Sequence, residues 1–277
     1  MHTTRRTAVV LFGAVLISVG VFAATAFASH SWGGYHWART ANPFTLKLGD
    51  DVSSVWDGHL VTASADWNEQ TSASSTAPTV LNTTVVAGQS NPKNCRATNG
   101  RVEVCNSKYG NKGWLGIASI WVSGSHIAQG TVKLNDTYFN TSRYNTPAWR
   151  QFVMCQEVGH TFGLDHQDEI FDNANLGTCM DYTNDPSGTL YGQLSNEHPN
   201  THDYEELGTI YAHLDSFTTL VASAFGKAAA SAARDIDTEN PSEWGRAIRH
   251  SSDGRSSLFE RDFGRGQKVF TFVVWAD

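Results

Sequence analysis

The sequence has no extended cluster of Lys and Arg, no C-x-x-C pair of cysteines and no motif for binding DNA or RNA. It carries 20 basic and 27 acidic side chains, with a formal net charge of −7 at pH 7. Because nucleic-acid binding depends on clustered Lys and Arg, this composition argues against a nucleic-acid partner. The missing C-x-x-C spacing argues against a zinc site built from thiolates.

Internal repeats, long Pro-rich or Gly/Ser-rich linkers and EF-hand spacing are also missing. If the first 28 residues are removed as a signal peptide, about 250 residues remain. That length fits one large domain, or one domain with a small appendage.

The first 28 residues are typical of a secretory signal peptide. Two arginines form the positive region, residues 8–26 are apolar, and Ala26-Phe27-Ala28 matches an A-x-A cleavage site. A retained membrane anchor is the alternative, because the apolar run is nearly long enough to span a bilayer. We expect cleavage, secretion and no stable membrane insertion afterwards. The mature chain would keep 27 acidic and 18 basic side chains (20 minus two arginines), a balance of −9.

The most informative motif is the run Gln156-Glu157-Val158-Gly159-His160-Thr161-Phe162-Gly163-Leu164-Asp165-His166. Residues four apart share one face of a helix, so Gln156 and His160 can reach the same metal ion. Glu157 projects beside them and can hold a metal-bound water. Gly163 can adopt positive φ and end the helix, which lets the chain turn back and present His166. Three ligands with an open water position are typical of a catalytic zinc site.

This run resembles the metzincin pattern H-E-x-x-H-x-x-G-x-x-H of zinc metallopeptidases, with Gln156 in place of the first histidine. Further along, Gly177-Thr178-Cys179-Met180-Asp181-Tyr182 resembles the Met-turn of that family. Its methionine packs beneath the metal ligands, and in some members a tyrosine two residues later adjoins the metal. The alternative for Met180 is an ordinary core methionine, since Met often fills gaps.

The resemblance implies a Zn²⁺ cofactor with His160 and His166 as ligands and Gln156 as the third. Glu157 would take a proton from the metal-bound water and deliver it to the leaving amine. Glutamine is a weaker zinc ligand than histidine, so two alternatives stay open. Either the metal site is lost, or another group completes the shell, with the candidates being Asp165, Asp168 and Tyr182.

We therefore expect a secreted zinc-dependent endopeptidase that acts as a monomer on a protein or peptide substrate. One alternative is a catalytically silent domain on the same scaffold that binds peptide or cell-envelope components. Gln156 favours that alternative, and the intact Glu157 argues against it. Another alternative is an amidase that acts on peptidoglycan or a small molecule through the same zinc chemistry. Residues 29–40 contain no cysteine, so activation through a cysteine switch is not expected.

The four cysteines fit an oxidising destination and allow three pairings. Cys95 and Cys105 flank a short polar segment with the turn sequence Asn99-Gly100, so their bridge would close a local hairpin. Cys155 and Cys179 each directly precede a residue of the two motifs. A bridge between them would tie the active-site helix to the Met-turn.

The expected fold class is α+β and metzincin-like, with a twisted mixed sheet, the active-site helix, the Met-turn and a C-terminal helix. The expected domains are a signal peptide at 1–28, a catalytic domain at 29–215 and an extension with a β-hairpin at 216–277. Residue patterns predict strands at 44–48, 79–86, 101–104 and 115–122, and helices at 55–70, 148–162 and 203–214.

The segment Ile117–Asn140 contains an apolar-rich run that ends at residues 130–135. This run resembles the edge strand that lines the substrate cleft of metzincins. In that family an extended peptide pairs with such a strand. His126 lies near this predicted cleft strand. Several histidines lack ligand spacing and are assigned structural or surface roles, namely His59, His126, His198, His202 and His213.

Overall fold

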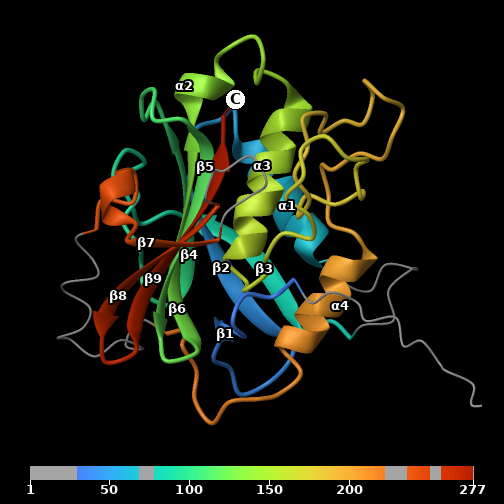
Figure 1. Ribbon diagram of the computed structural model, residues 1–277. Coiled ribbons are helices and arrows are strands. Elements are labelled where there is room, and N and C mark those ends of the chain that lie inside the picture. The colour runs from blue at the N-terminus through green and yellow to red at the C-terminus, as the bar shows by residue number, and fades with distance from the viewer. Residues whose placement is uncertain (1–29, 69–77, 222–235, 250–256, 277) are drawn as a thin grey trace, which may run out of the picture.

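The computed structural model describes residues 30–68, 78–221, 236–249 and 257–276, and the predicted signal peptide lies outside these ranges. The described chain combines one large mixed sheet with a few helices (Figure 1), so the expected α+β class is confirmed. Among the described residues, no helix is long and apolar enough to cross a membrane.

The strands are β1 (His36–Trp37), β2 (Phe44–Asp51), β3 (Leu81–Ala87), β4 (Arg101–Ser107), β5 (Trp114–Ser123), β6 (His126–Asn135), β7 (Arg246–Arg249), β8 (Leu258–Gly264) and β9 (Gln267–Trp275). The helices are α1 (Asp57–Asn68), α2 (Asp136–Phe139), α3 (Pro147–His160), α4 (Thr201–Ile210) and the 3₁₀ helix η1 (Pro241–Glu243).

The strand order across the sheet is β3-β2-β4-β6-β5-β9-β8-β7, and β1 pairs separately with β6. The pairs β2–β3, β2–β4 and β4–β6 are parallel. From β6 onward the sheet is antiparallel, through β5, β9, β8 and β7. The C-terminal hairpin therefore continues the main sheet rather than forming a separate one.

Helices α1 and α3 pack against each other and against the sheet (Figure 1), and the main hydrophobic core lies at this contact. Strand β9 is buried on both faces, so it reads as a continuous apolar run rather than an alternating one. Phe270, Phe272 and Val274 join the main core. Val273 joins a second cluster with Trp244. Two-sided burial fixes β9 firmly beside β5.

The predicted helices are present, with small shifts at their ends. Helix α3 begins at Pro147, one residue before the predicted start, and the side chain of Thr146 caps it by accepting a hydrogen bond from Trp149 N. Helix α4 begins two residues earlier than predicted. Its cap is Asn200, which forms a capping box with Asp203. The hairpin β8–β9 confirms the expected C-terminal hairpin.

The expectation that residues 130–135 form an edge strand is wrong. These residues lie in β6, which is hydrogen-bonded to β4 on one side and β5 on the other. Strand β5 is not an edge either, because β9 pairs with it along its whole length. The apolar content of this run could not show that the strand is central, because an edge strand and a central strand can have the same apolar content.

Both expected disulfides are present, Cys95–Cys105 and Cys155–Cys179. The first does not close a hairpin, because Cys105 lies in β4 while Cys95 lies in an irregular segment. Strand β4 instead finds parallel partners in β2 and β6. The second joins α3 to the segment that carries Met180, as expected. Disulfides of this kind are typical of oxidising compartments.

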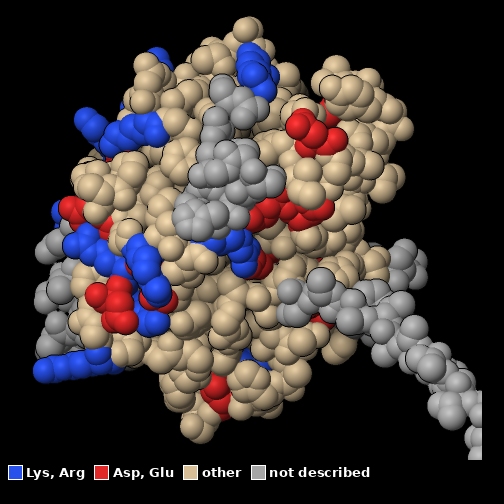
Figure 2. Space-filling model, in the orientation of Figure 1, with Lys and Arg blue, Asp and Glu red and all other residues tan. Residues whose placement is uncertain are grey.

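On the face drawn in Figure 2, acidic and basic side chains are mixed around the C-terminal hairpin. Glu260 pairs with Arg246 and Lys268, and Arg261 pairs with Glu243. These partly exposed pairs lie near the surface, where an ion pair contributes little stability. Because acidic and basic groups are paired in this way, the drawn face of the hairpin carries both charge signs rather than a patch of one sign.

Removing the Cys155–Cys179 bridge by Cys155→Ala/Cys179→Ala is expected to lower the free energy of unfolding by about 3 kcal/mol, because the unfolded chain regains loop entropy. Denaturant titration without reductant measures this change. The control is Cys95→Ala/Cys105→Ala, which opens a shorter sequence separation of 10 residues instead of 24. A midpoint unchanged by both double variants would contradict the two pairings.

Candidate metal centre

Helix α3 holds three candidate residues, Gln156, Glu157 and His160, in the protein core. All three side chains have no solvent exposure. Residues 150–160 are all buried, since α3 is covered by the sheet, by α1 and by the segment that follows it (Figure 1). Polar side chains in such a place cost free energy unless they gain partners, so each of them requires an explanation.

Gly163 reverses the chain just after α3, as predicted. Its φ is +99°, and a Cβ atom there would lie 2.2 Å from Tyr35 O. Only glycine combines that backbone conformation with so close an approach. The reversal brings His166 back onto the end of α3, where its Nε2 atom lies 2.9 Å from His160 Nε2. The structure therefore brings together the two histidines that the motif nominated.

The outer nitrogens of both imidazoles are already occupied. His160 Nδ1 lies 2.9 Å from Leu164 O, and a carbonyl can only accept, so this nitrogen carries the proton. His166 Nδ1 lies 2.8 Å from a carboxylate oxygen of Glu169. When both imidazoles are neutral, each Nε2 atom carries a lone pair, and the two lone pairs face each other. Two lone pairs at this distance repel unless a proton or a metal ion lies between them.

Burial lowers the pKa of His160 well below its ordinary value, and the neighbouring His166 lowers it further. Burial alone would raise the pKa of Glu169, but hydrogen bonds and charges from His166, Ser257 and Arg249 lower it to about 2. A neutral imidazole is the form of histidine that binds a metal ion, and an ionised carboxylate is the form that accepts a hydrogen bond from such a histidine. The sequence analysis did not select Glu169, which orients His166. The signal that could have indicated it is a carboxylate three residues after a candidate ligand.

Gln156 directs its two amide atoms to different places. Its Nε2 donates to Cys179 O at 2.8 Å, which ties α3 to the Met180 segment. Its Oε1 is buried without a hydrogen-bond partner among the described residues. Since Gln156 and His160 are four residues apart, they lie on one face of the helix. An orphaned amide oxygen on that face fits a weak third metal ligand.

Glu157 is wedged between α3 and two strands. Burial raises its pKa well above the ordinary value, and the backbone N–H groups of Ala118 on β5 and Val274 on β9 oppose that rise. Within the described chain, neither carboxylate oxygen has a hydrogen bond of ordinary geometry. Space for the carboxylate comes from Gly116, where a Cβ would lie 2.5 Å from Glu157 Oε1.

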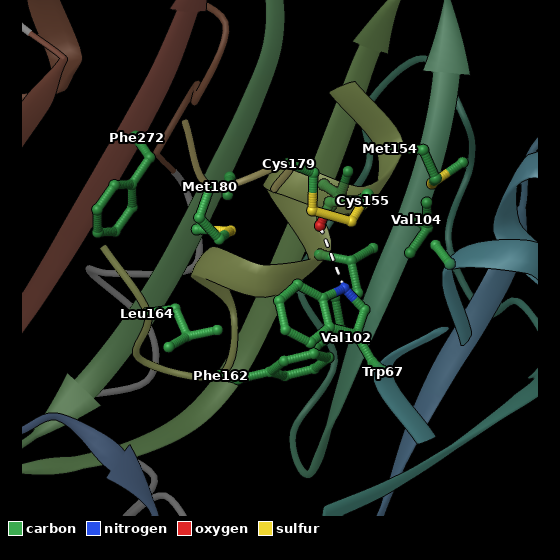
Figure 3. Close-up of a cluster of buried hydrophobic side chains, with 14 of the residues drawn as sticks. Trp67, Val102, Val104, Met154, Cys155, Phe162, Leu164, Cys179, Met180 and Phe272 are labelled. Carbon is green, nitrogen blue, oxygen red and sulfur yellow. Dashed lines mark hydrogen bonds between the residues drawn. A yellow bond between two sulfur atoms is a disulfide. The ribbon is translucent and has the colours of Figure 1, made fainter. Parts of the chain in front are cut away.

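Met180 lies in the main hydrophobic core and packs against α3. A Cβ on Gly159 would lie 2.7 Å from Met180 Sδ, so the glycine permits this close contact. Figure 3 shows Met180 near the Cys155–Cys179 bridge, and the indole of Trp67 donating to Cys155 O at 3.2 Å. The disulfide thus holds Cys179, and with it the neighbouring Met180, against α3.

Tyr182 reaches both the candidate ligands and the C-terminal strand. Its ring centroid lies 4.4 Å from that of His166. Its hydroxyl donates to Val273 O on β9 at 3.1 Å. Burial raises its pKa well above the ordinary value. Tyr182 is therefore beside the two histidines, but its hydroxyl is bonded to the hairpin.

The two acidic alternatives for the third ligand point elsewhere. Asp165 forms a bidentate ion pair with Arg249 on β7. Asp168 accepts from Ile170 N and from the side chain of Asn173. Asp165, His166 and Glu169 do have ligand atoms close to one another, but the His166 atom in that group is the one that faces Glu169. Gln156 remains the better third candidate.

Strand β9 closes the centre. The Phe272 ring stacks on the His160 ring, with centroids 4.2 Å apart and planes 11° apart. Figure 3 shows Phe272 on the same side of α3 as Met180. His166 is the most exposed of the four candidate residues, at 7%. In this arrangement a substrate peptide cannot reach the histidines or Glu157.

No family model matches this chain, and a search of curated proteins finds no match.

Replacing Gly116 by alanine is expected to lower the free energy of unfolding by about 1–3 kcal/mol, because the new methyl group overlaps Glu157 and Val153. Gly58→Ala is the matched control, since nothing lies within 4 Å of its Cβ and the position is exposed on α1. There alanine should be neutral or slightly stabilising. Equal effects of the two substitutions in denaturant titration would contradict the assigned position of Glu157.

Proposed function

We propose that this protein is a secreted, metzincin-like zinc endopeptidase that acts as a monomer on a protein or peptide substrate. The observation that carries the proposal is the approach of His160 Nε2 to His166 Nε2 with Glu157 on the same helix. The two disulfides support an oxidising destination. Residues 29–215 would hold the centre, and the remaining residues would regulate access to it.

His160, His166 and Gln156 Oε1 would hold Zn²⁺. When bound, zinc polarises a peptide carbonyl and lowers the pKa of a water molecule. Glu157 would accept the proton released when that water attacks, and then donate it to the leaving amine. Glu169 would keep the Nδ1 proton of His166 in place, so that its Nε2 lone pair stays directed at the metal.

The covered centre means that the proposed peptidase is latent in this conformation. Strand β9 occupies the side of β5 where an extended peptide could otherwise add a strand, and its Phe272 covers His160. A substrate would replace β9 by pairing with the same backbone groups of β5. Activation would then need the hairpin to move or be removed.

A catalytically silent binding domain is the second candidate. It is favoured by Gln156, whose amide nitrogen is bound to Cys179 O as in a purely structural role. Against it, Glu157 is fully buried, and the N–H groups of Ala118 and Val274 meet it without hydrogen bonds of ordinary geometry, so its burial costs free energy. A purely structural role does not require a carboxyl group there. An amidase on peptidoglycan or a small molecule would use the same centre, and substrate profiling separates it from an endopeptidase.

Gln156→His, which restores an imidazole at the first ligand position, is expected to tighten zinc binding about tenfold, or about 1.4 kcal/mol. Gln156→Ala should weaken it, and His160→Ala should abolish zinc binding at this centre. Competition titration with a chromophoric chelator measures the affinities. A zinc affinity that none of the three substitutions changes would contradict the assignment of Gln156 and His160 as ligands. Loss in His160→Ala but not in Gln156→Ala would assign the third position to another group.

Phe272→Ala is expected to raise hydrolysis of a mixed peptide library at least about tenfold. Truncating a buried Phe costs roughly 3–5 kcal/mol of packing, and each 1.4 kcal/mol shifts the balance toward the open form about tenfold. Phe259→Ala is the matched control, because Phe259 lies on the same hairpin but packs with Trp244. Adding Glu157→Gln should abolish the activity. A zinc-loaded Phe272→Ala protein that cleaves nothing would support the silent binding domain.

A further inference from the structure

Three histidines and one aspartate converge at a second place, where β1 meets the segment that follows α4. His36 lies in β1, His126 begins β6, and His213 and Asp215 follow α4. His36 is buried, the side chain of Asp215 is 9% exposed, and the side chain of His213 is 55% exposed. No spacing in the sequence connects these residues, which is why His126 and His213 were assigned structural or surface roles.

The nitrogen and oxygen atoms of this cluster lie at metal-ligand separations from one another. His36 Nε2 lies 3.1 Å from His213 Nε2. Asp215 Oδ2 lies 3.5 Å from His36 Nε2, and Asp215 Oδ1 lies 3.9 Å from His213 Nε2. Tetrahedral zinc with bonds of about 2.0–2.1 Å requires ligand atoms about 3.4 Å apart. The three separations scatter around that value.

The tautomer of His36 agrees with a ligand role. His36 Nδ1 lies 2.8 Å from Gly34 O, and because a carbonyl only accepts, this nitrogen carries the proton. His36 Nε2 is therefore a lone pair directed at His213 and at a carboxylate. Backbone carbonyls commonly hold the second nitrogen of zinc-binding histidines in this way.

Two further groups hold Asp215 in place. Arg39 Nη1 lies 3.1 Å from Asp215 Oδ2, and the same guanidinium also binds the carbonyls of Tyr211 and His213. His126 Nε2 lies 3.1 Å from Asp215 Oδ1. The backbone N–H of Arg39 also donates to Asp215 Oδ2, at 3.2 Å. Because a carboxylate offers about four acceptor sites, these three donors leave one site free, on Oδ1. Arg39 and His126 thus orient the aspartate without replacing a metal.

We propose that His36, His213 and Asp215 form a second Zn²⁺ site, with His126 as a positioning residue. Two imidazoles with one carboxylate suit zinc and disfavour calcium, which takes oxygen ligands. The exposed edge at His213 leaves room for water as a fourth ligand. The site would fasten β1 to the segment that follows α4. It shares no residue with the candidate metal centre and does not depend on the proposed function.

The test is the zinc content per chain of the purified full-length protein after dialysis against metal-free buffer and reloading with zinc chloride. We expect two zinc ions in the wild type, one in His213→Ala, one in His160→Ala and none in the double variant. His198→Ala is the matched control, because His198 is 54% exposed and also bonded to a carboxylate, that of Asp66. It should keep both ions.

The His160→Ala background isolates the second site, so failure of the two proposals can be told apart. In that background zinc should raise the melting temperature, His213→Ala should remove the rise, and His126→Ala should weaken zinc binding about 10–100-fold. Equal zinc content with and without His213→Ala in both backgrounds would overturn the second site. Zinc lost only through His213→Ala would support it and sink the candidate centre instead.

Discussion

The reversal of the chain at Gly163 is the constraint on which the candidate centre depends. A φ of +99° and the close approach of Tyr35 O leave no space for a side chain there. Helix α3 therefore stops at His160, and six residues later His166 faces it across 2.9 Å. A straight continuation of the helix would carry His166 away from His160. The contact of Met180 with Gly159 and the Cys155–Cys179 bridge then hold the end of the helix against the segment that follows it.

Because the polar atoms at the end of α3 are buried, they need partners other than water. Gln156 Oε1 and both oxygens of Glu157 are buried without adequate partners among the described residues, and the two Nε2 lone pairs face each other. Each of these features costs free energy where protein groups are the only neighbours, and a bound cation would remove most of that cost. His36 and His213 repeat the same pairing of Nε2 atoms at 3.1 Å beside a carboxylate. In both places two imidazole Nε2 atoms lie close together, beside further nitrogen or oxygen atoms with which they could share a cation.

The parts of this account that the sequence could predict are local ones. Helical spacing placed Gln156 and His160 on one face, and glycine chemistry located the turn at Gly163. Adjacency to the motifs suggested the Cys155–Cys179 bridge. The misplaced edge strand, the covering by β9 and the cluster around Asp215 all depend on contacts between distant segments. Phe272 and His160 are 112 positions apart (272 minus 160), and no periodicity within one segment encodes their stacking. Glu169 lies between these cases, since its spacing from His166 is local but its role depends on the fold.

X-ray absorption spectroscopy at the zinc edge tests the central claim most directly, on His213→Ala protein so that only the candidate centre contributes. The account predicts a first shell of nitrogen and oxygen at about 2.0–2.1 Å, with the outer-shell scattering of two imidazoles. Replacing His166 by alanine should remove one of the two imidazoles from that spectrum. A protein that holds no zinc at this position, or zinc with sulfur neighbours at about 2.3 Å, would contradict it.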